Sequence, residues 1–484
     1  MAIASREGNM KAPREESALV VKLMEAIDAG RFEEADRMLP HLKTNADPLV
    51  AILEAEVNLY FCRLEPARER LAQIDPWRLG TRSLSRYLLA LGQCHLEHEQ
   101  WESAGELLEG ACCLYKLLHA RCHLARGLYY LGMTKFKRGN GEEAEALWEQ
   151  AKALLIEEET ARGDFALGVL EYALGARRLQ TGRVEEARAL LHSSVRLLDE
   201  EHGRYYASAL GALGALLASC GECADAVEKL WEAQRILIRY AIGDPLVEVT
   251  TTLAAALVRI ERFDEAERAV HESLDALQRL GHARGAGRMF KTLAEIYLER
   301  NDVARAENAA RVTLEHAETL RDDVLRAEGQ ILLGRTAARR RDREAAEQAL
   351  SRAREIARRL DDRKLEGLAC LYWAEACYAV SPMQAQELIA RAQELLRPLS
   401  DPRIEQEIER VAQRATSERI KLTPDNKLIF DGNFLPNWYV ARETLERFLL
   451  KNALRQAEGN LTKAGELLGI TKVHVHNLRR QFNL

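Results

Sequence analysis

Small and apolar residues recur along this chain at an interval of about 40 residues. The clearest copies of the repeated turn read Gly30-Arg31-Phe32-Glu33-Glu34-Ala35, Gly182-Arg183-Val184-Glu185-Glu186-Ala187 and Glu261-Arg262-Phe263-Asp264-Glu265-Ala266. The alanine that ends each copy, the anchor alanine, returns at Ala35, Ala67, Ala104, Ala144, Ala187, Ala226, Ala266, Ala306, Ala346 and Ala385. From Ala104 onward the intervals are 40, 43, 39, 40, 40, 40 and 39 residues. A period sustained in this way predicts a stack of similar structural units.

Two further landmarks keep the same register as the anchor alanine. Twelve residues before the anchor stands a small residue that follows a leucine, in Leu91-Gly92, Leu131-Gly132, Leu174-Gly175, Leu213-Gly214, Leu253-Ala254, Leu293-Ala294 and Leu333-Gly334. Seven residues after the anchor stands another small side chain: Ala111, Ala151, Ser194, Ala233, Ser273, Thr313, Ala353 and Ala392. Because two helices approach closely only where small side chains meet, each unit is predicted to be a pair of antiparallel helices. Neighbouring pairs then stack, since one pair cannot bury its apolar face alone.

This pattern resembles the tetratricopeptide repeat family over roughly Ser17 to Ala415. The period is longer than the 34 residues usual in that family, so the helices are expected to be about a turn longer. The first two units lack the leucine–glycine pair, and Pro382 lies in the turn of the tenth, as expected of terminal repeats. We predict an all-α fold: an α-solenoid of about ten helix pairs over residues 17–415, after a disordered segment over 1–16.

In such an array the first helix of each pair lines a concave groove. The repeat register places nine larger side chains there: Arg126, Tyr129, Met133, Tyr172, Glu248, Thr251, Arg288, Lys291 and Arg335. Very small residues fall between them, at Gly211, Ala215, Ala218 and Ala255. Basic residues over a smooth floor suit an acidic peptide or helix, and the resemblance implies a protein or peptide partner. The alternative interpretation is that these side chains form ordinary solvated helix faces.

The composition agrees with a helical protein outside membranes. Charged residues make up 30% of the 484 residues and hydrophobic residues 47%, while proline is scarce at 11. No apolar run approaches the roughly 18 residues that cross a bilayer. Residues 1–16 are polar, with no secretory signal, so we expect a cytoplasmic protein whose nine cysteines are free thiols.

The repeat pattern stops near Lys421, and a different organisation follows. Residues 427–430 and 433–435 are apolar-rich and flank Asp431-Gly432, which predicts a short β-hairpin within a linker over 416–437. An irregular linker is the alternative. Three helices are then expected in a domain over 438–484, at about 438–457, 462–468 and 472–482.

The last two of these helices are short and are joined through Gly469, which is typical of a helix-turn-helix. Thr471 is a natural N-cap for the third helix. Val475, Leu478 and Phe482 have the spacing of an inward-facing side. The residues left outside are Lys472, Val473, His474, His476, Asn477, Arg479 and Arg480, and all but Val473 can hydrogen-bond to a base edge or a phosphate.

Charge is distributed unevenly between the two parts of the chain. Residues 436–484 carry a balance of +4, whereas the remainder carries −10, within a net charge of −6. A basic tail on an acidic body indicates that the tail is the part that meets polyanions. An excess of this size is small, however, and does not establish the function alone.

The stretch from Phe448 to Leu484 resembles the Fis-type helix-turn-helix family. The resemblance lies in Ala453-Leu454, Gly459-Asn460, Thr462-Lys463-Ala464, Leu467-Leu468-Gly469-Ile470-Thr471 and the last helix. It implies phosphate contacts at Asn460, Thr462 and Lys463, base contacts at Lys472, His474, His476 and Asn477, and a homodimer paired through the helix over 438–457. The last helix is usually more basic than here, where two histidines stand in it, so weaker or pH-sensitive binding is expected.

Candidate catalytic and metal-binding patterns are weak by comparison. Cys220 and Cys223 form a Cys-x-x-Cys pair, but they lie in the turn before Ala226 with no strand pattern nearby, which favours a structural turn over a redox motif. A second group comprises Cys94, His95, His98, Cys112, Cys113, His119, Cys122 and His123, whose spacing within helices specifies no metal geometry. The chain has no phosphate-binding loop, dinucleotide fingerprint or nucleophile elbow. We therefore expect no enzyme activity, no cofactor and no metal.

These features predict a sequence-specific regulator of transcription that binds double-stranded DNA through residues 438–484. Its DNA-binding residues are predicted to be Asn460, Thr462, Lys463, Thr471, Lys472, His474, His476, Asn477, Arg479 and Arg480. Such a protein would associate with the nucleoid. The alternative is an interaction scaffold whose C-terminal module serves docking or dimerisation.

Overall fold

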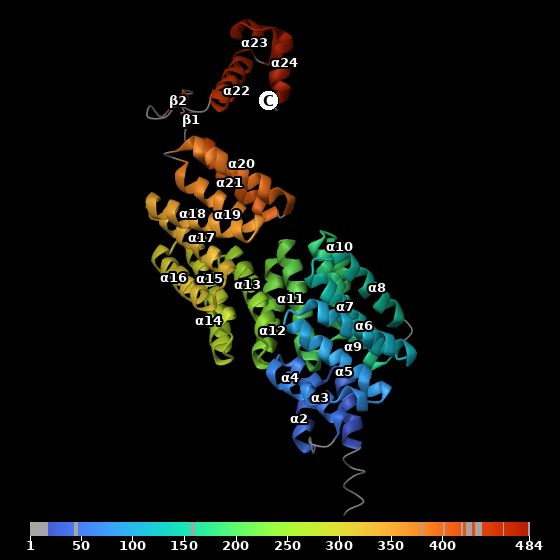
Figure 1. Cartoon of the computed structure of the whole chain (residues 1–484). Helices are drawn as coiled ribbons and strands as arrows, with labels where there is room; N and C mark the ends of the chain where they lie inside the picture. The colour runs from blue at the N-terminus through green and yellow to red at the C-terminus, as the bar shows by residue number, and fades with distance from the viewer. Residues whose placement is uncertain are drawn as a thin grey trace, which may run out of the picture. The chain divides into compact units, whose positions relative to one another are not determined.

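The computed structural model describes residues 18–42, 47–155, 160–378, 381–399, 402–417, 420–422, 428–430, 438–457 and 459–482. The chain divides into two compact units, Met1–Thr292 and Leu293–Leu484, and the boundary falls inside helix α15 (Ala283–Glu299). Within each unit the helices pack in chain order (Figure 1). None of the helices in the described part of the chain has the length and hydrophobicity needed to cross a bilayer.

Unit 1 consists of successive antiparallel helix pairs. A helix over residues 18–28 pairs with α2 (Phe32–Met38), and we call these two the N-terminal helix pair. The following pairs are α3 (Pro48–Tyr60) with α4 (Leu64–Ala72), α5 (Thr81–Glu97) with α6 (Trp101–Leu117), α7 (Arg121–Lys137) with α8 (Gly141–Leu155), α9 (Ala161–Gln180) with α10 (Val184–Leu197), α11 (Gly203–Ser219) with α12 (Cys223–Arg239), and α13 (Gly243–Arg259) with α14 (Phe263–Arg279). Short 3₁₀ turns lie at η1 (Leu39–His41), η2 (Pro76–Arg78) and η3 (Glu200–His202).

Unit 2 continues the repeat and then changes character. Its pairs are α15 with α16 (Val303–Leu320), α17 (Asp323–Arg339) with α18 (Arg343–Arg359), and α19 (Arg363–Cys377) with α20 (Pro382–Leu396). After η4 (Arg397–Leu399) and α21 (Pro402–Ser417) come strands β1 (Ile420–Leu422) and β2 (Leu428–Phe430), and then helices α22 (Trp438–Gln456), α23 (Leu461–Leu468) and α24 (Lys472–Gln481). In the residues that the structure describes, the fold is the predicted one, ten helix pairs followed further along the chain by a small three-helix module.

The sequence landmarks are the contact points of the helix pairs. All ten anchor alanines are fully buried, and so are the eight small residues seven positions after them. The glycine twelve positions before an anchor packs on the side chain four positions after it. A Cβ on Gly132 would lie 2.3 Å from Nε1 of Trp148, and one on Gly214 would lie 2.5 Å from Cγ of Leu230. Only glycine permits these two approaches, which explains why the period is so visible.

The structure contains a short hairpin in the region where the sequence predicted one. Leu428–Phe430 forms a strand that pairs with Ile420–Leu422 upstream, with Ile420 opposite Phe430. The predicted pairing across Asp431-Gly432 involves residues that the structure does not describe. Residues 431–437 lie outside the described residues. The five residues between the two strands include Pro424, Asp425 and Asn426, which are residues that favour turns. The sequence therefore contains a second candidate turn upstream of Asp431-Gly432.

Candidate nucleic-acid interface and partner groove

The three C-terminal helices enclose a small core of their own. Its buried residues are Leu450, Ala453, Ala457, Ala464, Val475 and Phe482. Leu478 and Ile470 are partly buried against this core, so the inward-facing side of α24 is the one that the helical spacing predicted. The opposite side of α24 is therefore left to solvent.

Side-chain caps fix where the two short helices begin. Oδ1 of Asn460 accepts hydrogen bonds from the backbone amides of Thr462 at 3.0 Å and Lys463 at 3.3 Å. Oγ1 of Thr471 accepts one from the amide of His474 at 3.3 Å, which confirms the predicted N-cap. These bonds satisfy amides that have no partner inside the helix.

The turn between α23 and α24 depends on two glycines. Gly469 has φ of +67°, in the left-handed region that glycine adopts at least cost. Gly465, which the sequence analysis passed over, packs against the turn itself, because a Cβ there would lie 2.7 Å from the carbonyl oxygen of Ile470. The turn is therefore tight, and it sets the direction in which α24 leaves the module.

The ten predicted DNA-binding residues are all exposed: Asn460, Thr462, Lys463, Thr471, Lys472, His474, His476, Asn477, Arg479 and Arg480. They occupy one module, with three on the first turn of α23 or its cap and seven on α24 or its cap. Asn460 and Thr471 use their side-chain oxygens as caps, so a contact to a phosphate at Asn460 would come from its amide nitrogen. The arrangement presents donors and acceptors on the exposed side of α24 and at the start of α23.

Unit 1 contains a hollow of about 450 Å³ between the first helices of five pairs, α5, α7, α9, α11 and α13. Its aromatic lining comprises Tyr129, Tyr130, Phe136, Trp148, Tyr172 and Tyr205, and its small residues are Gly211, Ala212 and Ala215. Four of the larger residues predicted for the groove line it: Tyr129, Met133, Tyr172 and Glu248. A volume of this size falls in the range of pockets that hold ligands.

Charged groups sit among these aromatic side chains. Arg204, at the start of α11, points its guanidinium nitrogens to Oε1 of Glu97 at 3.6 Å and to Sγ of Cys62 at 3.5 Å. Burial raises the pKa of Tyr172 to about 12, so its hydroxyl stays neutral and able to donate. Arg204 and Glu97 were missed by the sequence analysis, because repeat register shows which face a residue lies on but not what it meets across the stack.

The other predicted groove residues lie elsewhere. Arg126 is turned to Glu56, with Nη1 3.2 Å from Oε2, and Thr251 donates to the carbonyl of Val247 at 2.8 Å. Arg288 and Lys291 lie on α15, the first exposed and the second half-buried. None of these four lines the 450 Å³ hollow.

Arg335 lies in a second hollow of about 430 Å³, within unit 2. Its guanidinium stands 4.6 Å from the centre of the Tyr372 ring and 3.2 Å from Oε1 of Glu299. Arg410 lines the same hollow and pairs with carboxylates of Glu375 at 2.8 Å and Glu407 at 2.6 Å. The positive charge that the sequence predicted for this part of the groove is therefore balanced by glutamates.

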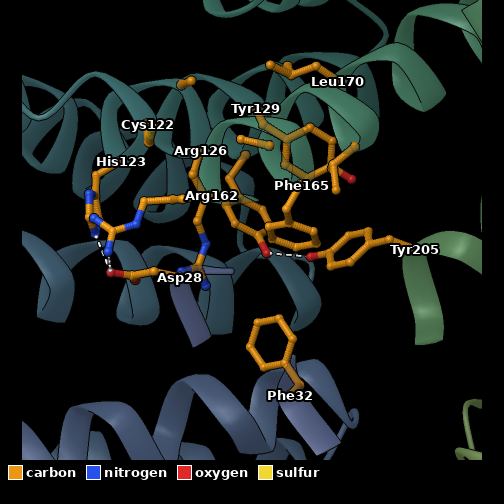
Figure 2. Close-up of a pocket in the computed structure, with 14 residues that line it drawn as sticks. Asp28, Phe32, Cys122, His123, Arg126, Tyr129, Arg162, Phe165, Leu170 and Tyr205 are labelled. Carbon is orange, nitrogen blue, oxygen red and sulfur yellow. Dashed lines mark hydrogen bonds and ion pairs between the residues drawn. The ribbon is translucent and has the colours of Figure 1, made fainter. Parts of the chain in front are cut away.

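The N-terminal helix pair closes against helices that are distant in sequence. Asp28, at the end of the first helix, lies 2.8 Å from Arg86 of α5 and 3.4 Å from both His123 of α7 and Arg162 of α9. Figure 2 shows its carboxylate below His123 and Arg162. Burial opposes ionisation, but Arg86, His123 and Arg162 together lower the pKa of Asp28 below its usual value. Asp28 is thus held as a carboxylate by side chains from α5, α7 and α9, the first helices of three successive pairs.

Aromatic contacts complete this closure. Phe32 stacks on Tyr60 with ring centres 4.0 Å apart. It also meets the edge of Phe165, with ring centres 6.4 Å apart, and Figure 2 shows these two rings. The carbonyl oxygen of Ala29 lies 3.2 Å from Nε2 of His202 in η3. The cavity that Phe32 lines has a volume of only about 30 Å³, enough for roughly one water molecule.

A hydrogen bond of 2.9 Å between the hydroxyls of Tyr130 and Tyr205 stands between this small cavity and the 450 Å³ hollow, because both tyrosines line both spaces. Burial raises the pKa of Tyr130 well above its usual value, so the hydroxyl of Tyr130 is neutral at physiological pH. Tyr130 and Tyr205, which line the small cavity beside the N-terminal helix pair, therefore also form part of the wall of the 450 Å³ hollow.

The cysteine patterns have simple positions in the fold. Cys220 caps the end of α11 and is exposed, while Cys223 begins α12 and is buried. Among the described residues, no three His, Cys, Asp or Glu side chains are arranged to hold a metal ion. Cys94 and His98, from the larger group, lie one helical turn apart with Sγ 3.8 Å from Nδ1.

Comparison with known proteins finds a similar family for the C-terminal helices and similar solved structures for the repeat array. Residues 441–473 match the family described as bacterial regulatory protein, Fis family. The match covers α23 and ends at Val473, so it includes Lys472 and excludes the remainder of α24. No match was found among curated protein sequences.

A large part of the chain is similar to helical-repeat structures. The apo form of the quorum sensor NprR from B. thuringiensis has a TM-score of 0.51 at 13% identity, covering 71% of this chain and 99% of that one. A tetratricopeptide repeat protein from Parabacteroides merdae ATCC 43184 has a TM-score of 0.38 at 15% identity, covering 59% of this chain and 98% of that one. At these identities the likeness concerns the fold alone. The array therefore has the fold of helical-repeat proteins, and residues 441–473 are similar to the Fis family of bacterial regulatory proteins.

Proposed function

We propose that this protein is a sequence-specific DNA-binding regulator of transcription, in which α24 reads the DNA and the repeat array binds a protein or peptide. The observation that carries the proposal is the exposed side of α24, where Lys472, His474, His476 and Asn477 stand on its first two turns while Val475 is buried. The start of a recognition helix is the end that reaches base edges in the major groove. No catalytic step forms part of this proposal.

Position along the module separates the residues that we assign to base contacts from those that we assign to phosphate contacts. Lys472, His474, His476 and Asn477 are assigned to base edges. Arg479 and Arg480, farther along α24, are assigned to phosphates together with Asn460, Thr462 and Lys463 at the start of α23. Phosphate contacts fix the register on the duplex, and base contacts supply the sequence preference.

We also propose that the protein binds as a homodimer paired through α22. Leu445 and Leu449 are 41% and 44% exposed, and because they are four residues apart they share one side of that helix. A second copy of α22 would cover both. Two recognition helices would then enter successive major grooves about 34 Å apart.

For the partner of the array, the 450 Å³ hollow of unit 1 is the assigned site. Its aromatic walls suit apolar side chains, and its charged lining residues are of both signs: Lys137, Arg177, Arg204, Glu97 and Glu248. This chemistry fits a peptide of mixed character better than the purely acidic one expected from Arg288, Lys291 and Arg335.

The corresponding division of the chain is a short N-terminal segment over 1–16, the array over 17–415, a linker over 416–437 and the DNA-binding domain over 438–484. Such a protein would act at the nucleoid.

The test is selection of binding duplexes from a random pool by the full chain, with the doubly substituted Lys472→Ala/Arg480→Ala chain in parallel. Arg352→Ala, which removes an exposed cation from α18 in the array, is the matched control. We expect the wild type and the control to enrich the same sequence, and the double variant to enrich none. Enrichment by none of the three, at any salt concentration, would favour the scaffold role instead.

A further inference from the structure

One side chain on the exposed side of α24 has no assigned role. Val473 is 69% exposed, although it is β-branched and apolar, and it is surrounded by side chains that can all hydrogen-bond. It contributes nothing to the core of the module, which is built from six other buried residues. Its exposure therefore has no explanation in the folding of the module.

The position of Val473 matches that of the proposed base-reading residues. Thr471 caps α24, so Val473 is the second residue of the helix, at the end proposed to enter the major groove. It lies four residues before Asn477, and residues at that spacing stand one above the other on a helix. Val475, between them, is buried and marks the opposite side. Val473 and Asn477 consequently project together.

Few groups in the major groove offer a surface to an apolar side chain. Base edges there present hydrogen-bond donors and acceptors, with one apolar group among them, the 5-methyl of thymine. An asparagine side chain is suited to the N6 and N7 edge of adenine. Four residues of helix span about 6 Å, and base pairs are stacked about 3.4 Å apart, so two such side chains reach bases about two pairs apart.

We propose that Val473 is a specificity-determining residue that packs on the methyl group of a thymine about two base pairs from the base contacted by Asn477. This inference rests on the proposed DNA-binding function and adds the chemical identity of one base in the site. A helix with lysine, histidine and asparagine alone would read polar edges, and Val473 adds recognition of a group that only thymine carries.

The experiment removes the methyl group without changing any hydrogen-bonding atom. The full chain is used to select a duplex from a random pool, and each thymine of that duplex is then replaced singly by deoxyuridine. Dissociation constants are measured for the wild type, Val473→Ala and Val473→Ile. We expect one thymine in each half-site at which uracil weakens wild-type binding about fourfold, the effect of one buried methyl-sized group. Val473→Ala should no longer distinguish the two bases, and Val473→Ile should distinguish them at least as well.

A salt titration on random duplex is the matched control. None of the substitutions changes charge, so the slope of the logarithm of the binding constant against that of the salt concentration should be identical in all three proteins. Because Val473 is exposed, the thermal midpoint of Val473→Ala should also equal that of the wild type.

The outcomes separate this inference from the proposed function. If the wild type binds its selected duplex but tolerates uracil at every thymine, the inference is wrong and the function stands. If Val473→Ala retains the full preference for thymine, the methyl group acts through DNA shape or another residue, and the inference is again wrong. If the wild type binds no duplex, the proposed function fails and this inference fails with it.

Discussion

The chemistry of the C-terminal module depends on which side of α24 each residue occupies. Val475 is fully buried, and the residues flanking it, His474 and His476, are exposed. Both facts follow from the spacing of apolar residues in the sequence, because a helix of 3.6 residues per turn buries only one stripe. The capping role of Asn460 was less predictable, since an asparagine at that position can cap a helix, contact a phosphate or do both.

We predict that Asn477→Ala and Arg480→Ala weaken DNA binding in different ways. Loss of a base contact should cost roughly 1–3 kcal/mol on the selected duplex and relax its sequence preference, with little change on random DNA. Loss of a phosphate contact should weaken binding to every duplex and lower the salt slope by about one unit per half-site. Titrations of both variants on both duplexes measure this. Equal losses on all sequences would show that the assigned division of labour is wrong.

A second prediction concerns a histidine in unit 1. Nε2 of His282 lies 3.1 Å from Oδ1 of Asp244, and this hydrogen bond raises the pKa of His282 and lowers that of Asp244. A raised histidine pKa stabilises the fold below the unfolded value of about 6.5, and the contribution disappears as the pH rises through the folded value. The thermal midpoint of His282→Gln should therefore fall below that of the wild type at pH 5.5, and the gap should narrow above pH 7 to the part that comes from the lost hydrogen bond between the Gly285 amide and Nδ1 of His282.

The control for this prediction is His271→Gln, at an exposed histidine on α14 whose distance to Glu267 is 3.9 Å. Its midpoint should follow the wild type at every pH. A gap for His282→Gln that is constant across the pH range would mean that the pair does not stabilise the fold through its charge.

The helix pairs are the part of the molecule most readable from sequence, because their contacts are local. Each pair joins two helices across one turn, so the three landmarks repeat at fixed offsets and every copy reinforces the next. The hairpin near Leu428 was less readable, since two candidate turns lay within ten residues of one another. A single short pairing has no second copy to decide between them.

Substitution at the helix crossings tests this register. Gly132→Leu or Gly214→Leu forces a side chain into Trp148 or Leu230, and we expect a loss of roughly 1–3 kcal/mol or more from overpacking. Gly105→Leu in α6 is the control, because a Cβ there meets nothing within 4 Å and leucine favours helix over glycine. Chemical denaturation measures all three. Destabilisation of the control alone, or of none, would mean that these glycines are not the crossing points.

Contacts between distant parts of unit 1 were beyond sequence reasoning. Asp28 meets Arg162 and Ala29 meets His202, separations of more than 130 residues that no periodic pattern encodes. The same limit applies to Arg204, whose surroundings come from several pairs at once. The closure by the N-terminal helix pair and the lining of the groove are therefore products of the stack as a whole.

We predict that Asp28 holds the N-terminal helix pair against the later helices of unit 1. Asp28→Asn leaves Arg86 without one buried carboxylate partner, which should cost about 3 kcal/mol locally. Amide exchange in residues 18–38 should accelerate about a hundredfold, while exchange in α17 and α18 stays unchanged. Asp36→Asn, which breaks an exposed pair with Arg63, is the control and should change little. Uniform acceleration throughout the chain would contradict a local role.

The proposal that α24 reads DNA is tested most directly by a footprint of the full chain on genomic DNA fragments that the protein captures at physiological salt. We predict protected sites that share one sequence, each with two protected segments one helical turn apart, about 34 Å, and loss of that shared sequence for Asn477→Ala. Absence of protection at every salt concentration, or protection of fragments with no sequence in common, would contradict the claim that α24 reads DNA.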